Sequence, residues 1–149
     1  MGQTIVFAES CTGGLLSASL TSISGSSQVF KGSIISYSNE LKNSLLSISE
    51  EKLTKYGAVS EEICEDMAIN VKEKLEADWS IAISGIAGPK GGSQDKPVGL
   101  VYVSIAGPNN HITNIKKIFN STRDRLEIQT LSVNVCLNSL RLILLSNSK

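Results

Sequence analysis

Short apolar runs typical of strands alternate along the chain with segments typical of helices, and this alternation constrains the fold more than any other feature. The strand-like runs are residues 4–8, 33–37, 79–84, 98–105 and 111–119. The helix-like segments are residues 15–21, 40–46, 50–56, 60–76 and 122–145. Strands interleaved with helices predict an α/β domain with a mixed, mostly parallel sheet that includes one antiparallel hairpin.

Length and charge argue against several classes of protein. A chain of 149 residues matches one domain and is long enough to bury a core. Its 14 basic and 14 acidic side chains cancel, which argues against binding nucleic acid or a membrane surface through bulk charge. We expect no membrane span, because no apolar run approaches the roughly 18 residues required. We expect no signal peptide, because the start of the chain lacks a basic segment.

The cysteines and the single histidine bear on location and on metal binding. Cys11, Cys64 and Cys136 are odd in number and widely spaced, which is typical of reduced thiols in a cytoplasmic protein. His111 is the one histidine, and the sequence has no Cys-x-x-Cys pair. We therefore expect no metal site. A Ser-His-Asp triad would have to use His111, which we expect on a solvated hairpin turn.

The turn after the first expected strand, residues 9–14 (ESCTGG), is the first candidate site. A hydroxyl there lies at a sheet edge beside the unpaired amides of a helix start, which can hold a phosphate or a developing oxyanion. Ser10 or Thr12 could equally serve only as a helix cap. Cys11 is a second candidate nucleophile, because a helix start lowers the pKa of a thiol.

A serine nucleophile needs a base, and Lys42 is the candidate. A lysine can act as a base if burial or a neighbouring cation lowers its pKa. Tyr37 precedes it by five residues and is expected at the end of a strand, where its hydroxyl could relay a proton. The residue types alone fit a solvated lysine and a half-buried core tyrosine equally well.

Two further segments could bind an anion. Residues 84–93 (SGIAGPKGGS) follow an expected strand, and their amides could cradle a phosphate or belong to a plain mobile loop. Arg123 and Arg125 stand at the start of the last expected helix. They could bind a phosphate or carboxylate, or form a surface ion pair with Asp124.

Six motifs in order are more informative than any one of them. They are residues 8–14 (AESCTGG), 25–27 (GSS), 37–42 (YSNELK), 56–60 (YGAVS), 84–92 (SGIAGPKGG) and 96–99 (KPVG). Over nearly its whole length the chain resembles the CinA C-terminal domain family, which includes stand-alone nicotinamide mononucleotide deamidases. The resemblance implies a three-layer α/β/α single domain over residues 1–149. It also implies hydrolysis of nicotinamide mononucleotide to nicotinate mononucleotide and ammonia, without metal or cofactor.

The resemblance also assigns roles to residues. It makes Ser10 the nucleophile, Lys42 the base and Tyr37 an assisting residue, and it matches the family's arginine near the last helix to Arg123. We expect the amides of the first turn to stabilise the oxyanion and the glycine loops to hold the nucleotide phosphate. The residues expected to bind substrate are Cys11, Thr12, Gly13, Gly14, Ser38, Asn39, Gly85, Gly88 and Arg123. The expected partners are a small nucleotide and a second copy of the chain in a dimer.

The chain departs from the family pattern in two places. The family usually has a helix before the first strand, and this chain starts almost at the strand, which we expect to bear on stability, the oligomer interface or a wall of the site. The family's Gly-Asp-Arg is matched to residues 121–123, and its second arginine, four residues later, to Glu127, with Arg125 as an alternative. These departures motivate a second hypothesis, a catalytically inactive nucleotide-binding or protein-interaction module of the same fold.

Overall fold

The computed structural model describes residues 2–147, and its five strands form one sheet. The strands are β1 (Ile5–Glu9), β2 (Phe30–Ile35), β3 (Trp79–Gly85), β4 (Leu100–Ala106) and β5 (Ile112–Ile118). Their order is β2-β1-β3-β4-β5. β1 pairs in parallel with β2 and β3, whereas β4 pairs antiparallel with β3 and with β5. The sheet is therefore mixed, with every strand except β4 running in the same direction.

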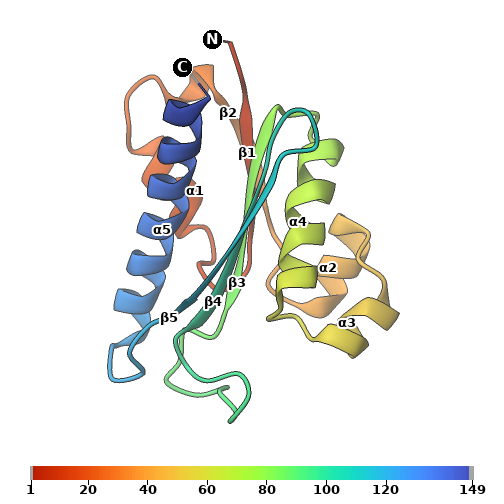
Figure 1. The fold of residues 1–149 in the computed structure, drawn as a ribbon, viewed down its shortest axis with the longest axis vertical. Helices are drawn as coiled ribbons and strands as arrows, with labels where there is room; N and C mark the ends of the chain where they lie inside the picture. Colours follow the sequence, from red (N-terminus) through yellow and green to blue (C-terminus); the bar gives the residue numbers. More distant parts are fainter. Residues whose placement is uncertain (1, 148–149) are drawn as a thin grey trace.

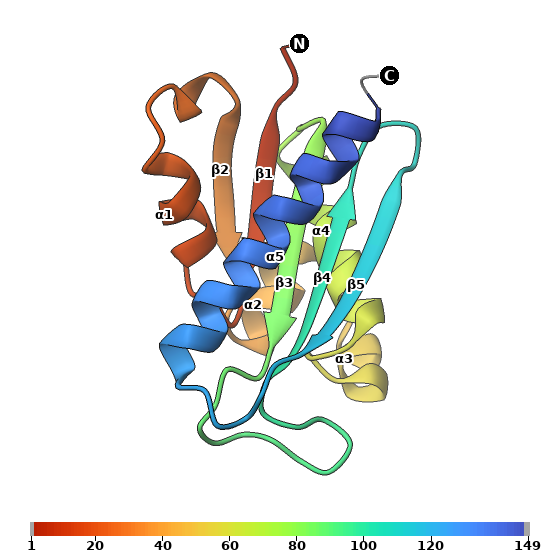
Figure 2. The ribbon, with the colours of Figure 1, turned by 60° about the vertical axis from the view of Figure 1, so that its left-hand side comes forward.

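Helices cover both faces of this sheet and complete three layers, as the sequence predicts. α1 (Leu15–Thr21) and α5 (Arg125–Ser146) lie on one face, and α2 (Asn39–Leu46), α3 (Glu50–Tyr56) and α4 (Glu61–Lys74) lie on the other (Figure 1). α5 crosses its face of the sheet diagonally, while α1 covers only the β2 side (Figure 2). A short 3-10 helix, η1 (Ser26–Gln28), precedes β2.

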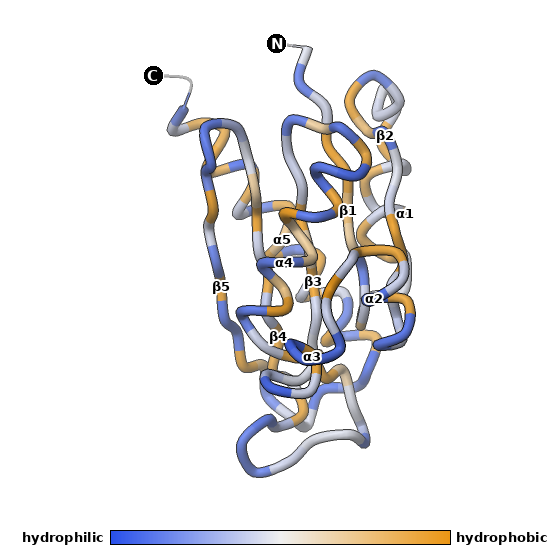
Figure 3. The backbone as a smooth tube through the Cα atoms, turned by 90° about the vertical axis from the view of Figure 1, so that its right-hand side faces the viewer, coloured by the Kyte–Doolittle hydropathy of each residue, from blue (hydrophilic) through white to orange (hydrophobic). Residues whose placement is uncertain are grey.

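The core is divided between the two faces by the alternation of side chains along the strands. Phe7 of β1 packs in the cluster that includes Ile128 of α5, and its neighbour Val6 packs in the cluster that includes Met67 of α4. The central strands are thus apolar on both sides, while the edge strand β5 is largely hydrophilic along part of its length (Figure 3). Lys116 and Lys117 of β5 are exposed, and charged side chains on an edge strand discourage unwanted pairing with another chain.

The structure shifts one expected strand. β2 spans Phe30–Ile35 instead of residues 33–37, so Tyr37 lies beyond the strand. β2 is an edge strand and most of its residues are only half-buried, so it needs no continuous apolar run. Lys31 and Gly32 therefore interrupt the sequence pattern without interrupting the strand.

The last helix is a further difference. α5 is, by length and composition alone, apolar enough to cross a membrane, contrary to the expectation that no segment would be. One face of α5 is buried against the sheet through Ile128, Val133 and Cys136. A core helix passes the same test, so the finding is weak evidence for a span.

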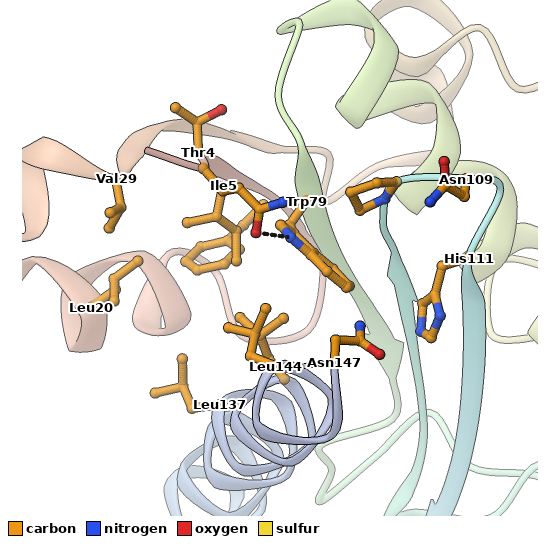
Figure 4. A pocket seen from close by; sticks show the side chains of 14 residues that line it. Thr4, Ile5, Leu20, Val29, Trp79, Asn109, His111, Leu137, Leu144 and Asn147 are labelled. Carbon is orange, nitrogen blue, oxygen red and sulfur yellow. Dashed lines mark hydrogen bonds between the residues drawn. The ribbon is translucent and has the colours of Figure 1, made fainter. Parts of the chain in front are cut away.

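A groove of about 850 Å³ lies at the amino-terminal ends of β1 and β3, between the sheet and α5. Its walls include Trp79 and Leu137, and the Trp79 indole N–H donates to the side-chain oxygen of Gln3 at 3.1 Å (Figure 4). α1 has only two turns, so this part of the sheet face is less covered. Gln3 and Thr4, which precede β1, line this groove. They lie at the opposite end of the strands from Ser10 and therefore form no wall of the cavity beside Ser10.

Candidate active site at the carboxyl edge of the sheet

The loops that follow β1, β2 and β3 meet at one edge of the sheet, where these three parallel strands end. Ser10 directly follows β1, and its backbone N–H donates to the carbonyl oxygen of Ile83 on β3 at 3.1 Å. A cavity of about 260 Å³ opens here, and its walls include Ser10, Lys42, Tyr37 and Arg125. This edge is where parallel α/β sheets generally bind ligands.

Lys42 reaches Ser10 from the inner face of α2. Its side chain is buried, with 1% of its surface exposed. The Lys42 Nζ atom lies 3.1 Å from Ser10 Oγ, 2.6 Å from the carbonyl oxygen of Ser36 and 3.4 Å from that of Tyr37. The structure therefore brings the expected nucleophile and the expected base into direct contact.

Lys42 Nζ donates to the Ser10 hydroxyl oxygen and to both carbonyl oxygens, which matches the three N–H donors of a charged lysine. Loss of one proton from Lys42 leaves two donors for the carbonyls and a lone pair that can accept the Ser10 hydroxyl proton. Within residues 2–147 no acidic side chain forms an ion pair with Lys42. Burial lowers the pKa of Lys42 from its usual value of 10.5. Lys42 is thus placed to act as a general base toward Ser10.

The turn that carries Ser10 is shaped by the buried carboxylate of Glu9. Its Oε2 accepts hydrogen bonds from Thr12 Oγ1 at 2.6 Å and from the amides of Gly14 and Leu16 at 3.1 and 3.0 Å. Its Oε1 accepts from the amide and hydroxyl of Ser17 at 2.8 and 2.6 Å. Glu9 therefore satisfies the free amides at the start of α1 from the preceding strand, a role usually taken by a cap residue. The Thr12 hydroxyl and the Gly14 N–H are therefore occupied by Glu9 and are not available to a substrate.

Two backbone N–H groups of the turn donate to no other residue among those described. The Gly13 N–H donates to the carbonyl oxygen of Ser10 at 3.1 Å. Contrary to the expectation for this turn, it is therefore not available to bind an oxyanion. Among the described residues, no other residue accepts a hydrogen bond from the Cys11 or Thr12 N–H, although the Cys11 N–H also faces its own thiol. These two amides, directly after Ser10, are the candidates for binding an oxyanion.

Cys11 lies in the cavity wall but is poorly suited to attack a substrate. Burial raises the pKa of its thiol to about 12, opposite to the lowering expected at a helix start. The thiolate is the reactive form of cysteine, so Cys11 is a weak nucleophile here. Cys64 and Cys136 are likewise buried, and burial raises both pKa values.

Tyr37 and the glycine-rich loop are joined by Arg125. Its guanidinium donates to the Tyr37 hydroxyl at 2.8 Å and to the Gly88 carbonyl oxygen at 2.7 Å. Tyr37 is 58% exposed and its hydroxyl has no partner other than Arg125 among the described residues. Because Lys42 contacts Ser10 directly, Tyr37 is not required as a proton relay between them.

Arg123 lies outside this cavity, which differs from the expectation. It forms an exposed ion pair with Glu127 at 3.7 Å. Asp124 is the N-cap of α5 and forms a capping box with Glu127, which accounts for the acidic residue at 127. Arg125, two residues further along, lines the cavity in place of Arg123.

The glycine-rich loop is closely packed where it borders the cavity. A Cβ atom on Gly85 would lie 2.8 Å from the Leu100 carbonyl oxygen, and one on Gly88 would lie 2.5 Å from Val98 Cγ1. Gly88 also has a φ of 81°, in the left-handed region that favours glycine. Both glycines line the cavity, as expected.

Two expected binding residues serve α2 instead. The Ser38 hydroxyl caps the helix by accepting from the Leu41 amide at 3.1 Å. Asn39 is an exposed first residue of α2 and lies outside the cavity. His111 lies beside Trp79 at the far end of the sheet and takes no part in the site.

Sequence reasoning missed Gln129, whose side-chain amide donates to the Cys11 carbonyl oxygen at 2.8 Å. It also missed Lys90, which lines the cavity. Gln129 has no motif signal, and only its spacing of one helical turn from Arg125 could have indicated it.

The fold and the site define a three-layer α/β/α domain in which a buried lysine contacts a serine at the edge of the sheet. Comparison with known proteins identifies its family. The model of the CinA C-terminal domain matches residues 1–144. A CinA-like protein of Prochlorococcus marinus (strain AS9601) is 90% identical over 99% of this chain and 35% of its own length. A CinA-like protein of Trichormus variabilis is 51% identical over 97% of this chain and 35% of its own length. The chain thus spans about a third of the length of these curated relatives.

Solved structures of similar proteins point to the same family. The competence/damage inducible protein CihA from Agrobacterium tumefaciens matches with a TM-score of 0.92 and 37% identity, over 95% of this chain and 85% of that one. A CinA superfamily protein from Escherichia coli matches with a TM-score of 0.89 and 30% identity, over 95% and 81%. The chain belongs to the CinA family, as a CinA C-terminal domain.

Replacing Glu9 with Gln tests the turn network. A glutamine amide group would face amide donors, so we expect the free energy of unfolding to fall by about 2 kcal/mol, the usual cost of unsatisfied buried groups. Urea unfolding measures it, with the exposed Glu40→Gln as control. Equal stability of Glu9→Gln and the wild type would contradict the network.

The lowered pKa of Lys42 predicts a pH dependence of stability. Between that pKa and 10.5 the unfolded chain holds a proton on Lys42 that the folded chain lacks, so stability from this residue rises with pH. We expect the advantage of Lys42→Met over the wild type in free energy of unfolding to shrink as pH rises toward 10.5. The exposed Lys74→Met should show no such trend. A difference that grows with pH would contradict the interpretation.

Proposed function

We propose that this domain hydrolyses the carboxamide of a pyridine nucleotide, nicotinamide mononucleotide, to the carboxylate and ammonia. The observation that carries the proposal is the 3.1 Å contact between Lys42 Nζ and Ser10 Oγ inside a cavity. Family membership supports the choice of this chemistry, because the resemblance that implies it covers the same residues.

The reaction begins with Ser10. Neutral Lys42 accepts the hydroxyl proton as Ser10 Oγ forms a bond to the amide carbon, and the carbonyl oxygen becomes an oxyanion. The amides of Cys11 and Thr12 are the available donors to this oxygen. Protonated Lys42 then gives its proton to the leaving nitrogen, the carbon–nitrogen bond breaks, and ammonia departs.

An acyl-enzyme on Ser10 remains. Lys42, neutral again, accepts a proton from water as the water oxygen attacks the ester carbon. The second tetrahedral intermediate collapses, Ser10 Oγ recovers the proton from Lys42, and the nicotinate product is released. Atoms balance as amide plus water giving acid plus ammonia, and the residues named here act without a metal.

Cationic groups at the cavity support a nucleotide substrate. Arg125 and the exposed Lys90 both line it, whereas the chain as a whole carries no net charge. A cavity of about 260 Å³ suits the reacting ring of a nucleotide, and the exposed Lys90 in its wall is a candidate to bind the phosphate. Glu127 lies outside the cavity and so supplies no argument for an inactive binding module.

The proposal predicts ammonia release from nicotinamide mononucleotide by the purified chain. Ser10→Ala and Lys42→Met should each lower kcat by at least about 1000-fold, because each removes a reacting group. Ser10→Ala should still bind the nucleotide. The exposed Ser44→Ala is the matched control. Wild-type turnover in Ser10→Ala would contradict the mechanism, and tight binding without ammonia release by the wild type would favour the binding module.

The pH profile tests Lys42 separately. Since only neutral Lys42 can accept the proton, kcat/KM should rise with pH through a single ionisation below 10.5. Initial rates in overlapping buffers measure the profile. A kcat/KM that stays constant or falls as the pH rises toward 10.5 would contradict a lysine base.

A further inference from the structure

Gln129 links α5 to the turn that carries the nucleophile. It stands one helical turn after Arg125, so both side chains extend from the same face of the helix. Arg125 holds Tyr37 and Gly88, while the Gln129 amide donates to the Cys11 carbonyl oxygen at 2.8 Å. The first two turns of α5 thus contact all three loops of the site.

The contact fixes the direction of one free amide. In a trans peptide the carbonyl oxygen and the following N–H point in opposite directions. With its carbonyl oxygen held toward Gln129, the Cys11–Thr12 peptide turns the Thr12 N–H away from α5. That N–H is one of the two amides beside Ser10 that donate to no other residue among those described.

The same peptide is held from its other side by Glu9. Its carboxylate binds the Thr12 hydroxyl at 2.6 Å and the Gly14 amide at 3.1 Å. Glu9 fixes the residues after the peptide, and Gln129 fixes the peptide itself. Without Gln129, no described group holds the Cys11 carbonyl oxygen.

We propose that Gln129 is a positioning residue that orients the Cys11–Thr12 peptide so that the Thr12 N–H binds the oxyanion formed at Ser10. This inference rests on the proposed acyl transfer at Ser10. α5 is anchored on the sheet by Ile128, Val133 and Cys136, so the helix does not need the Gln129 hydrogen bond to stay in place. Loss of the bond therefore affects the transition state more than the fold.

The test compares Gln129→Glu and Gln129→Leu with Asn134→Asp, the same amide-to-acid change on the exposed side of α5. An ionised glutamate keeps the shape but cannot donate. Loss of one oxyanion donor costs about 100-fold in kcat, so we expect losses of about 10- to 100-fold in both Gln129 variants. KM should stay within about 2-fold, because the bond to Cys11 does not touch bound substrate.

A second readout does not depend on the identity of the substrate. An alkyl fluorophosphonate forms a phosphorus–oxygen bond to a reactive serine, the phosphorus–fluorine bond breaks, and Lys42 takes the hydroxyl proton. Its phosphonyl oxygen occupies the place of the oxyanion. The labelling rate of Ser10 should fall by about the same factor as kcat in the Gln129 variants, remain at the wild-type value in Asn134→Asp and vanish in Ser10→Ala.

Each outcome decides between the proposals. Unchanged kcat and labelling in Gln129→Glu, with or without a lower Tm, would overturn the positioning role. Labelling of the wild type without ammonia release would overturn the proposed substrate, while the labelling rates of the Gln129 variants would still decide the inference. A wild type that neither labels nor releases ammonia would overturn both.

Discussion

The buried carboxylate of Glu9 determines the shape of the site, because it accepts five hydrogen bonds from the turn and the first residues of α1. These bonds tie the end of β1 to the start of α1 and leave Ser10 between them at the sheet edge. They also satisfy the carboxylate completely from one side. Glu9 therefore caps a helix and does not act as the counter-charge of a neighbouring lysine.

Because Glu9 binds the turn and not a lysine, Lys42 is left without a partner charge among the described residues. A buried lysine paired with a carboxylate keeps its proton, whereas a buried lysine with no partner charge loses it more readily, because burial disfavours the charged form. Lys42 contacts the carbonyls of Ser36 and Tyr37 and the hydroxyl of Ser10. Burial without a partner charge is costly for stability, but it produces a base at the one hydroxyl that the Glu9 turn presents. The fold thus separates an acidic group that organises the turn from a basic group that can react.

The sequence predicted the three layers, the five strands with β2 placed too late in the chain, and the pair Ser10 and Lys42. Alternating strand and helix patterns and a resemblance over six motifs can both be recognised along the chain without knowledge of the fold. The sequence could not predict which polar groups of the turn are already used. Thr12 and Gly14 bind Glu9, Gly13 binds Ser10, and Ser38 caps α2, which are choices made by backbone geometry. It also placed Arg123 in the site, because arginines stand on both sides of Asp124 and only the folded structure shows that Arg125 is the one that lines the cavity.

The most direct test of this account is the protonation state of Lys42 in the folded protein. NMR titration of lysine side chains labelled at the ε-carbon would follow each lysine separately, and the Lys42→Met spectrum would assign the signal. We expect the Lys42 signal to titrate clearly below 10.5. Titration at or above 10.5 would show a permanently charged lysine and would contradict its role as the base for Ser10.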